Sequence, residues 1–199
     1  MEKHDRHGRE RTQPENPGKE EKYMNAKQRC MAVLQKQRPD HTPFFPLLMF
    51  FAADRAGINF RTFSVDPVAL AEAQLNMFEN YRVDAVTACS DSFRISADFG
   101  AEIAYPENQT PYAVRPLLET HSDLKAIMQM HLDPMRQGSR MRQRVDSVEI
   151  LARSIGDRAL ICGWVEMPFA EVCDWFGVEN LMYLLFDDPE LVHSALEFA

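Results

Sequence analysis

The sequence predicts an α/β fold built around a parallel sheet, on two observations. Three apolar runs lack polar alternation, which is typical of strands covered on both faces; they span residues 44–51, 82–89 and 159–167. Between them lie segments with helical periodicity that begin at capping residues or at Pro. Strands that alternate with helices favour a parallel sheet over an antiparallel one.

The elements follow one another in a regular order. Residues 1–23 are polar, contain Pro14, Pro17 and Gly18, and predict a disordered tail before a folded domain over residues 24–199. A helix over residues 25–37 ends before Pro39. Further helices are expected from Pro67 to the strand at residue 82 and over residues 122–130, 133–156, 168–175, 179–186 and 188–199.

Two stretches are less regular. In the apolar run 44–51, Pro46 cannot donate to a strand ladder, so the strand proper is expected just after it. Residues 100–118 are rich in Pro, Tyr and Asn and predict irregular or short-strand structure. The helix over residues 133–156 carries a run of arginines that we expect on a solvated face, with phosphate binding as the alternative: Arg136, Arg140, Arg142 and Arg144.

Composition excludes several classes of function. The net charge is −8, and residues 1–23 hold equal numbers of acidic and basic side chains, so the folded part is acidic and poorly suited to nucleic acid. No run of 18 apolar residues predicts a membrane span. The four cysteines have no metal-ligand spacing and predict reduced core residues, which, with no apolar leader, indicates a cytoplasmic protein. His41, His121, His131 and His193 are expected at the surface.

The last helix is expected to continue beyond the sequence. Leu196, Phe198 and Ala199 lie within its apolar pattern, and no Gly, Pro or basic last turn follows them. We therefore expect the chain to be a fragment of a longer protein.

Several motifs resemble those of the uroporphyrinogen decarboxylase superfamily, which also includes methylcobamide:coenzyme M methyltransferases and related corrinoid-linked enzymes. In order, they are M-N-A-K-Q-R-C-M-A-V-L with R-P-D-H-T-P, A-C-S-D-S-F-R-I-S-A-D-F-G-A-E-I, P-Y-A-V-R-P-L-L, G-W-V-E-M-P-F-A-E-V and D-D-P-E-L-V-H. The resemblance implies a (β/α)8 TIM barrel, of which residues 24–199 would form the truncated N-terminal portion.

The resemblance also implies site residues. Asp91 falls on the catalytic Asp of the decarboxylases, with Ser90 beside it, although Ser90-Asp91-Ser92 is also what a turn or a helix cap requires. Glu166 ends a second strand and is a candidate substrate-binding residue, or a cap of the next helix. Asp174 stands where the decarboxylases place a Tyr, and is either a third binding residue or a surface position.

One departure from the family bears on the reaction. The decarboxylases carry two arginines in M-R-Q-A-G-R-Y, which bind substrate carboxylates, whereas M-F-F-A-A-D-R places Phe50 and Asp54 there and Arg55 one position later. This favours a methyltransferase that moves a methyl group between a corrinoid on a partner protein and a thiol or similar small-molecule acceptor. It would use zinc, with His and Cys ligands expected downstream of Ala199. The alternatives are a divergent uroporphyrinogen decarboxylase and a non-catalytic truncated barrel.

Overall fold

A computed structural model describes residues 23–199, so the predicted tail lies almost wholly outside the described residues. The helices of this part are α1 (Ala26–Leu34), α2 (Phe50–Ala56), α3 (Phe60–Val65), α4 (Pro67–Tyr81), α5 (Arg94–Asp98), α6 (His121–Met128), α7 (Arg140–Ile155), α8 (Pro168–Phe176), α9 (Val178–Asp187) and α10 (Pro189–Phe198). The strands are β1 (Ala85–Thr87), β2 (Ile103–Ala104), β3 (Tyr112–Ala113) and β4 (Leu160–Cys162).

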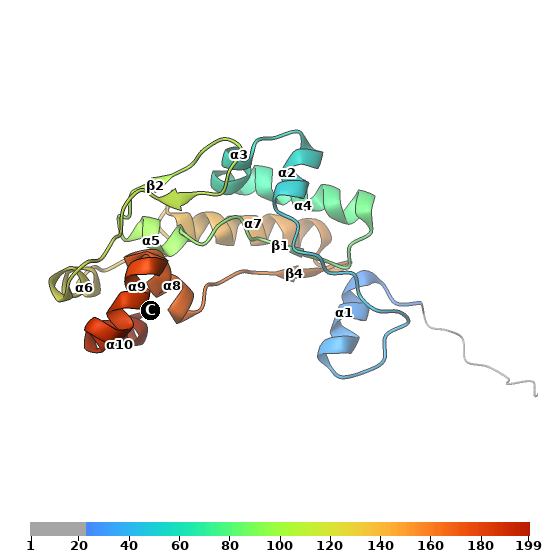
Figure 1. Cartoon of the computed structure of the whole chain (residues 1–199). Helices are drawn as coiled ribbons and strands as arrows, with labels where there is room; N and C mark the ends of the chain where they lie inside the picture. The colour runs from blue at the N-terminus through green and yellow to red at the C-terminus, as the bar shows by residue number, and fades with distance from the viewer. Residues whose placement is uncertain (1–22) are drawn as a thin grey trace, which may run out of the picture.

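The predicted α/β class is confirmed. Strand β1 pairs in parallel with β4, with Ala85 opposite Leu160 and Thr87 opposite Cys162. Helix α4 precedes β1 and helix α7 precedes β4, and the two helices lie side by side along one face of the molecule (Figure 1). The short strands predicted within residues 100–118 are β2 and β3, which form an antiparallel hairpin.

The helix-start signals predicted the structure well. The Asp66 carboxylate accepts from the backbone N–H of Val68 at 2.9 Å, and Pro67 occupies the first turn of α4. Asp188 caps α10 in the same way, through the N–H of Leu191 at 3.1 Å. Helix α6 begins one residue before the predicted Ser122, because Thr120 forms a capping box with Asp123.

The prediction of a strand within residues 44–51 is wrong. Residues 44–48 have no regular secondary structure, Met49 already has right-handed helical backbone angles as the N-cap of α2, and Phe50 and Phe51 belong to that helix. Pro43 and Pro46 have no N–H for a ladder, and one backbone hydrogen bond, from Asp84 N to Phe44 O at 2.8 Å, joins the segment to the residue before β1. The segment is therefore half-exposed instead of covered on both faces.

The other two predicted strands are shorter than expected. In 82–89 the ladder covers residues 85–87, although the burial prediction is right from Val83 to Cys89. In 159–167 the strand ends at Cys162, and Val165 and Met167 are 73% and 71% exposed. The apolar character of residues 163–167 therefore does not reflect a strand covered on both faces; within the described residues, β4 pairs with β1, which is itself only three residues long.

Helix α7 starts seven residues later than predicted. Residues 133–139 form turns, in which Asp133 accepts from the N–H of Met135 at 2.9 Å. Gly138 then adopts a positive φ of 83°, which a helix cannot contain, and the Ser139 hydroxyl caps the true start by accepting from Arg142 N at 3.0 Å.

Two apolar clusters form the core. The first joins α2, α3, α4, α7 and β1 through buried residues that include Phe60, Phe63, Met77 and Leu151. The second lies under α6, α8, α9 and α10, around Trp175 and Phe176. Cys30 and Cys89 are buried thiols as predicted, while Cys162 and Cys173 are half-buried, and all four are free. None of the described helices has both the length and the apolar content needed to span a bilayer.

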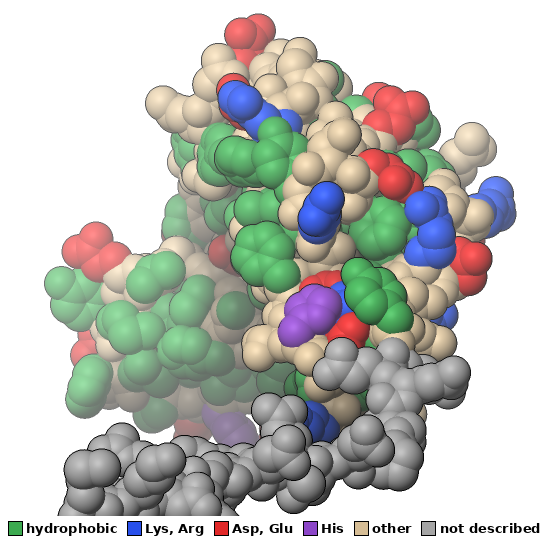
Figure 2. Space-filling model, turned by 90° about the vertical axis from the view of Figure 1, so that its right-hand side faces the viewer, with side chains coloured by type: hydrophobic (Ala, Val, Ile, Leu, Met, Phe, Trp, Pro, Cys, Tyr) green, Lys and Arg blue, Asp and Glu red, His purple; other side chains and the backbone are tan. Residues whose placement is uncertain are grey.

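The surface also carries apolar side chains. Figure 2 shows them gathered in patches, one of them over the fainter, more distant part of the view. Large apolar side chains that are exposed include Phe44, Phe45, Phe50 and Phe51 near α2, and Val178, Met182, Tyr183 and Phe186 on α9.

Helix α1 packs at the amino ends of β1 and β4. Arg29 forms ion pairs with Asp84, which precedes β1, and with Asp40 at 2.7 Å. Lys27 N donates to the carbonyl oxygen of Arg158 at 2.9 Å, two residues before β4. Salt bridges and a backbone hydrogen bond therefore join α1 to the amino ends of β1 and β4. The carboxyl ends of the two strands lie at the opposite end of the pair.

Candidate functional site

The candidate site lies where β1 and β4 end, the edge of a parallel sheet where barrel enzymes place their chemistry. After β1 the chain turns through residues 88–93 and enters α5. Arg94 is 2% exposed and ties this turn down: Nη1 donates to the Ala88 carbonyl at 3.0 Å and Nη2 to the Asp91 carbonyl at 2.9 Å. Burial lowers the pKa of Arg94 to about 10, so the side chain remains a cation at neutral pH.

Asp91 sits in this turn with its carboxylate fully engaged. Oδ2 accepts from Ser90 Oγ at 2.6 Å and from Arg140 Nη2 at 2.7 Å, and Oδ1 accepts from Phe93 N at 3.2 Å. The side chain is 2% exposed. Asp91 thus has the turn-forming contact that its sequence context allows, together with an ion pair that the sequence did not indicate. Its catalytic role stays a prediction.

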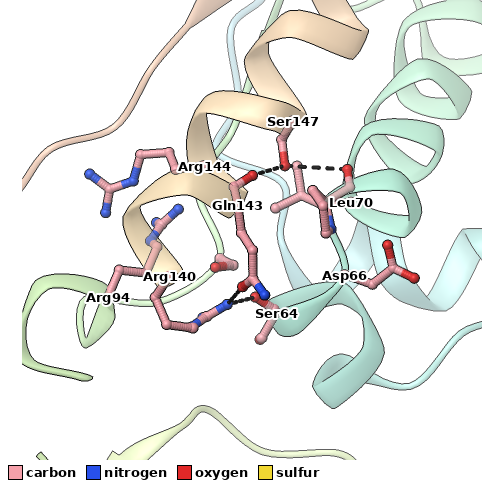
Figure 3. A pocket seen from close by; sticks show the side chains of 10 residues that line it. Ser64, Asp66, Leu70, Arg94, Arg140, Gln143, Arg144 and Ser147 are labelled. Carbon is pink, nitrogen blue, oxygen red and sulfur yellow. Dashed lines mark hydrogen bonds between the residues drawn. The ribbon is translucent and has the colours of Figure 1, made fainter. Parts of the chain in front are cut away.

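Arg140, the first residue of α7, is the partner of Asp91. Its Nη1 also donates to the Ser64 carbonyl at 2.8 Å and to Gln143 (Figure 3). Its guanidinium lies over the Tyr105 ring, 5.2 Å from the centroid. The side chain is 11% exposed, so the predicted solvated position is wrong for this arginine.

Arg144 lies one turn further along α7, and its surroundings differ. Its Nε and Nη2 atoms are buried and have no hydrogen-bond partner among the described residues. Figure 3 shows the side chain reaching away from Ser147 and Leu70. Burial lowers the pKa of Arg144, while the charges of Glu166 and Asp91 oppose that shift. The solvated-face prediction is wrong here too.

The other two arginines of the run behave as predicted. Arg136 is exposed, and Arg142 lies on a side of α7 where it forms ion pairs with Asp146 at 2.6 Å and Glu149 at 3.7 Å. A sequence signal did separate the two pairs. Arg140 and Arg144 continue the stripe of buried positions Ser147, Leu151 and Ile155 at helical spacing.

Glu166 and Asp174 come from the segment after β4. Glu166 is half-buried in the connection to α8, and Asp174 is on α8 itself. Burial raises the pKa of Asp174 to about 6; the Ser92 hydroxyl opposes this shift, and the negative charges of Glu166 and Asp91 add to it. The three carboxylates predicted from the sequence are therefore close enough to affect one another, and Ser90 joins them through its bond to Asp91.

Glu171, also on α8, is a buried carboxyl that the sequence reasoning missed. Its Oε1 accepts from Ser96 Oγ at 3.0 Å and from Trp175 Nε1 at 3.1 Å, and Oε2 has no partner within residues 23–199. Burial raises its pKa to about 7. The signal was its position next to Val172 and one turn before Trp175 on the apolar side of α8, where a charged residue is unusual.

The residues described offer no metal centre. Within residues 23–199, no group of three or more His, Cys, Asp or Glu side chains is arranged to hold an ion. Burial raises the pKa of the Cys89 thiol, which disfavours the thiolate that zinc requires. The four histidines named above are exposed, as predicted. The donor set of this region therefore does not fit the zinc that the resemblance implies.

Comparison with models of known protein families shows which family this chain belongs to. The model of the uroporphyrinogen decarboxylase (URO-D) family matches residues 25–199, nearly all of the described chain. The chain belongs to the URO-D family. No curated protein matches it.

Among solved structures, the fold is similar to a methyltransferase from Methanosarcina mazei, with a TM-score of 0.74 and 20% sequence identity. The match covers 87% of this chain and 52% of the methyltransferase, so the chain spans about half the length of that relative. The predicted fold, a portion of a URO-D-type barrel, is confirmed.

The two positions that depart from the decarboxylases of the URO-D family lie on α2. The Phe50 ring stacks on Phe60, with centroids 3.7 Å apart. The Asp54 carboxylate is exposed and pairs with Arg55 at 2.5 Å. Arg55 is half-exposed and pairs with this neighbouring carboxylate.

Proposed function

We propose that this URO-D family member is a methyltransferase that moves a methyl group between a corrinoid held by a partner protein and a thiol acceptor. Two findings support the proposal: membership of the family, and a fold similar over 87% of the chain to that of a methyltransferase. In such a transfer the acceptor loses its thiol proton, a sulfur–carbon bond forms, and the cobalt–carbon bond breaks with its electron pair remaining on the corrinoid.

The observation that carries the choice of reaction is the character of α2. Where the decarboxylases carry two arginines, this chain has a stacked aromatic ring and an exposed carboxylate already paired with Arg55. A tetrapyrrole with many carboxylates would lose charge-assisted hydrogen bonds here and meet an anion instead. An acceptor with few charges meets no such penalty.

The site's own residues suit a proton-handling role. The carboxyl of Asp174, with a pKa of about 6, is largely ionised at neutral pH and remains a competent proton acceptor. Asp91 is held by Arg140 in one orientation, and to receive a cationic or N–H-bearing group its carboxylate would have to exchange one of its present partners. Glu166 and Ser90 complete the polar surface that an acceptor would contact.

Zinc enters this proposal only as an expectation from the family. It would lower the pKa of the acceptor thiol, but the described residues do not form its site, so we derive no step through it. Ligands downstream of Ala199 remain the expectation. Metal analysis of a longer form of the protein, with and without chelator, tests it.

The proposal is tested by incubating the protein with methylcobalamin and a thiol, and by measuring the methyl thioether by mass spectrometry. We expect protein-dependent thioether formation that Asp91→Asn lowers and Arg153→Gln, an exposed change on α7, does not. Absence of the thioether with both free and protein-bound methylcorrinoid would contradict the proposal.

A second candidate, a divergent decarboxylase, is favoured by one observation. Arg94, Arg140 and Arg144 surround Asp91, so cations exist near the site even though α2 has lost them. Incubation with uroporphyrinogen decides between the two. Coproporphyrinogen formation would support the decarboxylase, and its absence beside thioether formation would remove it. Absence of both products would favour the non-catalytic alternative.

A further inference from the structure

A small cavity lies among α3, α4, α7 and the turn after β1 (Figure 3). Its volume is about 10 Å³, close to the minimum that a single water molecule requires. The side chains on its walls include Ser64, Ser90, Arg94, Arg140 and Arg144. Because it is so small, the cavity can hold one small particle, and it excludes a thiol substrate, a corrinoid and an oxyanion such as phosphate.

Several hydrogen-bond donors of these wall residues have no partner within residues 23–199. They are Ser64 Oγ, Arg94 Nε, Arg140 Nε, and Nε and Nη2 of Arg144. Ser64 and Arg94 are only 5% and 2% exposed, so bulk water does not satisfy them. A buried donor without an acceptor is destabilising, and more so when it is charged. The walls therefore favour an occupant that accepts hydrogen bonds.

Most acceptors on the same walls are already engaged. Oε1 of Gln143 accepts from Arg140, and the Ser90 hydroxyl is bonded to Asp91. Ser147 Oγ donates to main-chain carbonyl oxygens. A water molecule in the cavity must also donate its two hydrogens, and these groups leave it few acceptors. A monatomic anion has no hydrogens to place, so the excess of donors favours an anion over water.

Three guanidinium groups border this one small volume, those of Arg94, Arg140 and Arg144. Arg140 pairs with Asp91 at 2.7 Å, whereas Arg94 donates to main-chain carbonyls, which carry no net charge. Burial lowers the pKa of Arg94, and the charges of Arg144 and Arg140 add to this effect, as expected for cations held close together. An anion between them would offset this repulsion.

The nearby carboxylates leave the balance inside the cavity positive. Asp66 is a wall residue, but it is exposed, and Figure 3 shows its carboxylate turned away from the arginines. Asp174, with a pKa of about 6, is largely ionised at neutral pH, but neither it nor Glu166 lines the cavity. Arg94 and Arg144 form no ion pair within 4.0 Å in the part of the chain described.

We propose that this cavity binds one chloride ion, with Ser64, Arg94 and Arg140 as its hydrogen-bond donors. Arg144 supplies a further positive charge on the same wall as Arg140. The ion would join α3, α5 and the start of α7, and so hold Arg140 opposite Asp91. This proposal goes beyond the proposed function and does not rest on it, because the ion takes no part in methyl transfer.

Thermal unfolding in different sodium salts tests the proposal. The midpoint is measured at constant ionic strength while gluconate is exchanged for chloride, bromide or sulfate. We expect chloride and bromide to raise the midpoint with saturation, by roughly 5–10 °C at a hundred times the dissociation constant. Gluconate and sulfate are too large for the cavity, so any effect of sulfate should grow with concentration without saturating.

Substitutions locate the ion. Ser64→Ala removes one donor and should weaken chloride binding by about tenfold or more, because a hydrogen bond to a charged group is lost. Arg144→Gln removes one positive charge and should weaken it too. Ser154→Ala is the matched control, since it deletes a hydroxyl at an exposed position of α7, and it should leave the chloride dependence unchanged. The midpoint of each variant in gluconate shows that it is folded.

Bromide gives the position of the ion directly. Its anomalous scattering, in crystals grown with sodium bromide, should give a peak among Ser64, Arg94 and Arg140. The proposal is overturned if chloride and gluconate give the same unfolding midpoint, or if a saturable chloride effect is weakened by neither Ser64→Ala nor Arg144→Gln. A cavity without a bromide peak would overturn it as well.

Discussion

Nη2 of Arg140 lies 2.7 Å from Oδ2 of Asp91, and these side chains are only 11% and 2% exposed. The pair joins the start of α7 to the turn after β1, 49 residues apart in sequence. Breaking a buried pair by removing one partner costs about 3–5 kcal/mol, because an uncompensated charge remains. We therefore expect Arg140→Met to lower the free energy of unfolding by about that amount, as measured with urea.

A double variant identifies the cause. If the cost is the stranded carboxylate, Asp91→Asn combined with Arg140→Met should recover part of the loss, because no buried charge is left. Equal stability of the single and double variants would show that packing of Arg140 against Tyr105 and Ser64, and not its charge, is what matters.

Asp91→Asn on its own tests the catalytic prediction. The amide keeps the shape and the turn contact with Phe93 N but loses the charge. We expect turnover in the thioether assay to fall by about 10²-fold or more, the usual scale for a positioned charged or proton-transferring group, while the protein stays folded. Turnover equal to that of the unmodified protein would assign Asp91 to the turn alone.

Glu171 should make stability depend on pH. Its pKa is raised from 4.5 to about 7 in the folded state, so the folded state holds this proton more tightly than the unfolded chain. Its contribution is therefore fully present below about pH 4.5 and is lost as the pH rises towards 7. Asp174 acts in the same direction up to about pH 6.

Glu171→Gln separates the two groups. Above pH 6 most of the stability that Asp174 contributes has already been lost. The further fall in unfolding free energy between about pH 6 and 7 therefore belongs mainly to Glu171. We expect Glu171→Gln to flatten this part of a plot of unfolding free energy against pH. An unchanged slope would mean that Glu171 titrates with an ordinary pKa despite its burial.

Leu151 reports on the core under the site. It is fully buried on the stripe of α7 that also carries Arg140 and Arg144. Leu151→Ala should cost about 2–5 kcal/mol through lost burial and the cavity left behind. Val68→Ala, on an exposed position of α4, serves as the control and should change stability by about 0.5 kcal/mol or less. Similar effects of the two variants in chemical denaturation would contradict the assignment of this core.

The sequence predicted the helices well because their signals are local. Asp66 with Pro67 and Asp188 with Pro189 each place a carboxylate at a helix start, and both caps are present. Strand length was predicted poorly because a strand needs a neighbour as well as apolar residues. Residues 163–167 include Trp164, Val165 and Met167, yet they are not paired within the described chain.

The residues of the candidate site also include some that were predicted from the sequence and some that were not. Asp91, Glu166 and Asp174 were predicted because each falls on a family motif or next to a strand end. The burial of Arg140, Arg144 and Glu171 was missed because a charged residue within a helix is usually exposed, and their positions on the buried stripes of α7 and α8 were not given weight.

The ionic contacts of α1 have a consequence for how this protein tolerates change. Arg29, Asp40 and Asp84 secure the amino ends of β1 and β4, while the candidate site occupies their carboxyl ends, on the far side of the strand pair (Figure 1). The two ends of the strand pair are thus each held by buried ion pairs, and only one of them carries the candidate site. Substitutions at the α1 end can adjust how firmly the fold holds without reaching the acceptor, which leaves the other end free to diverge towards a new substrate.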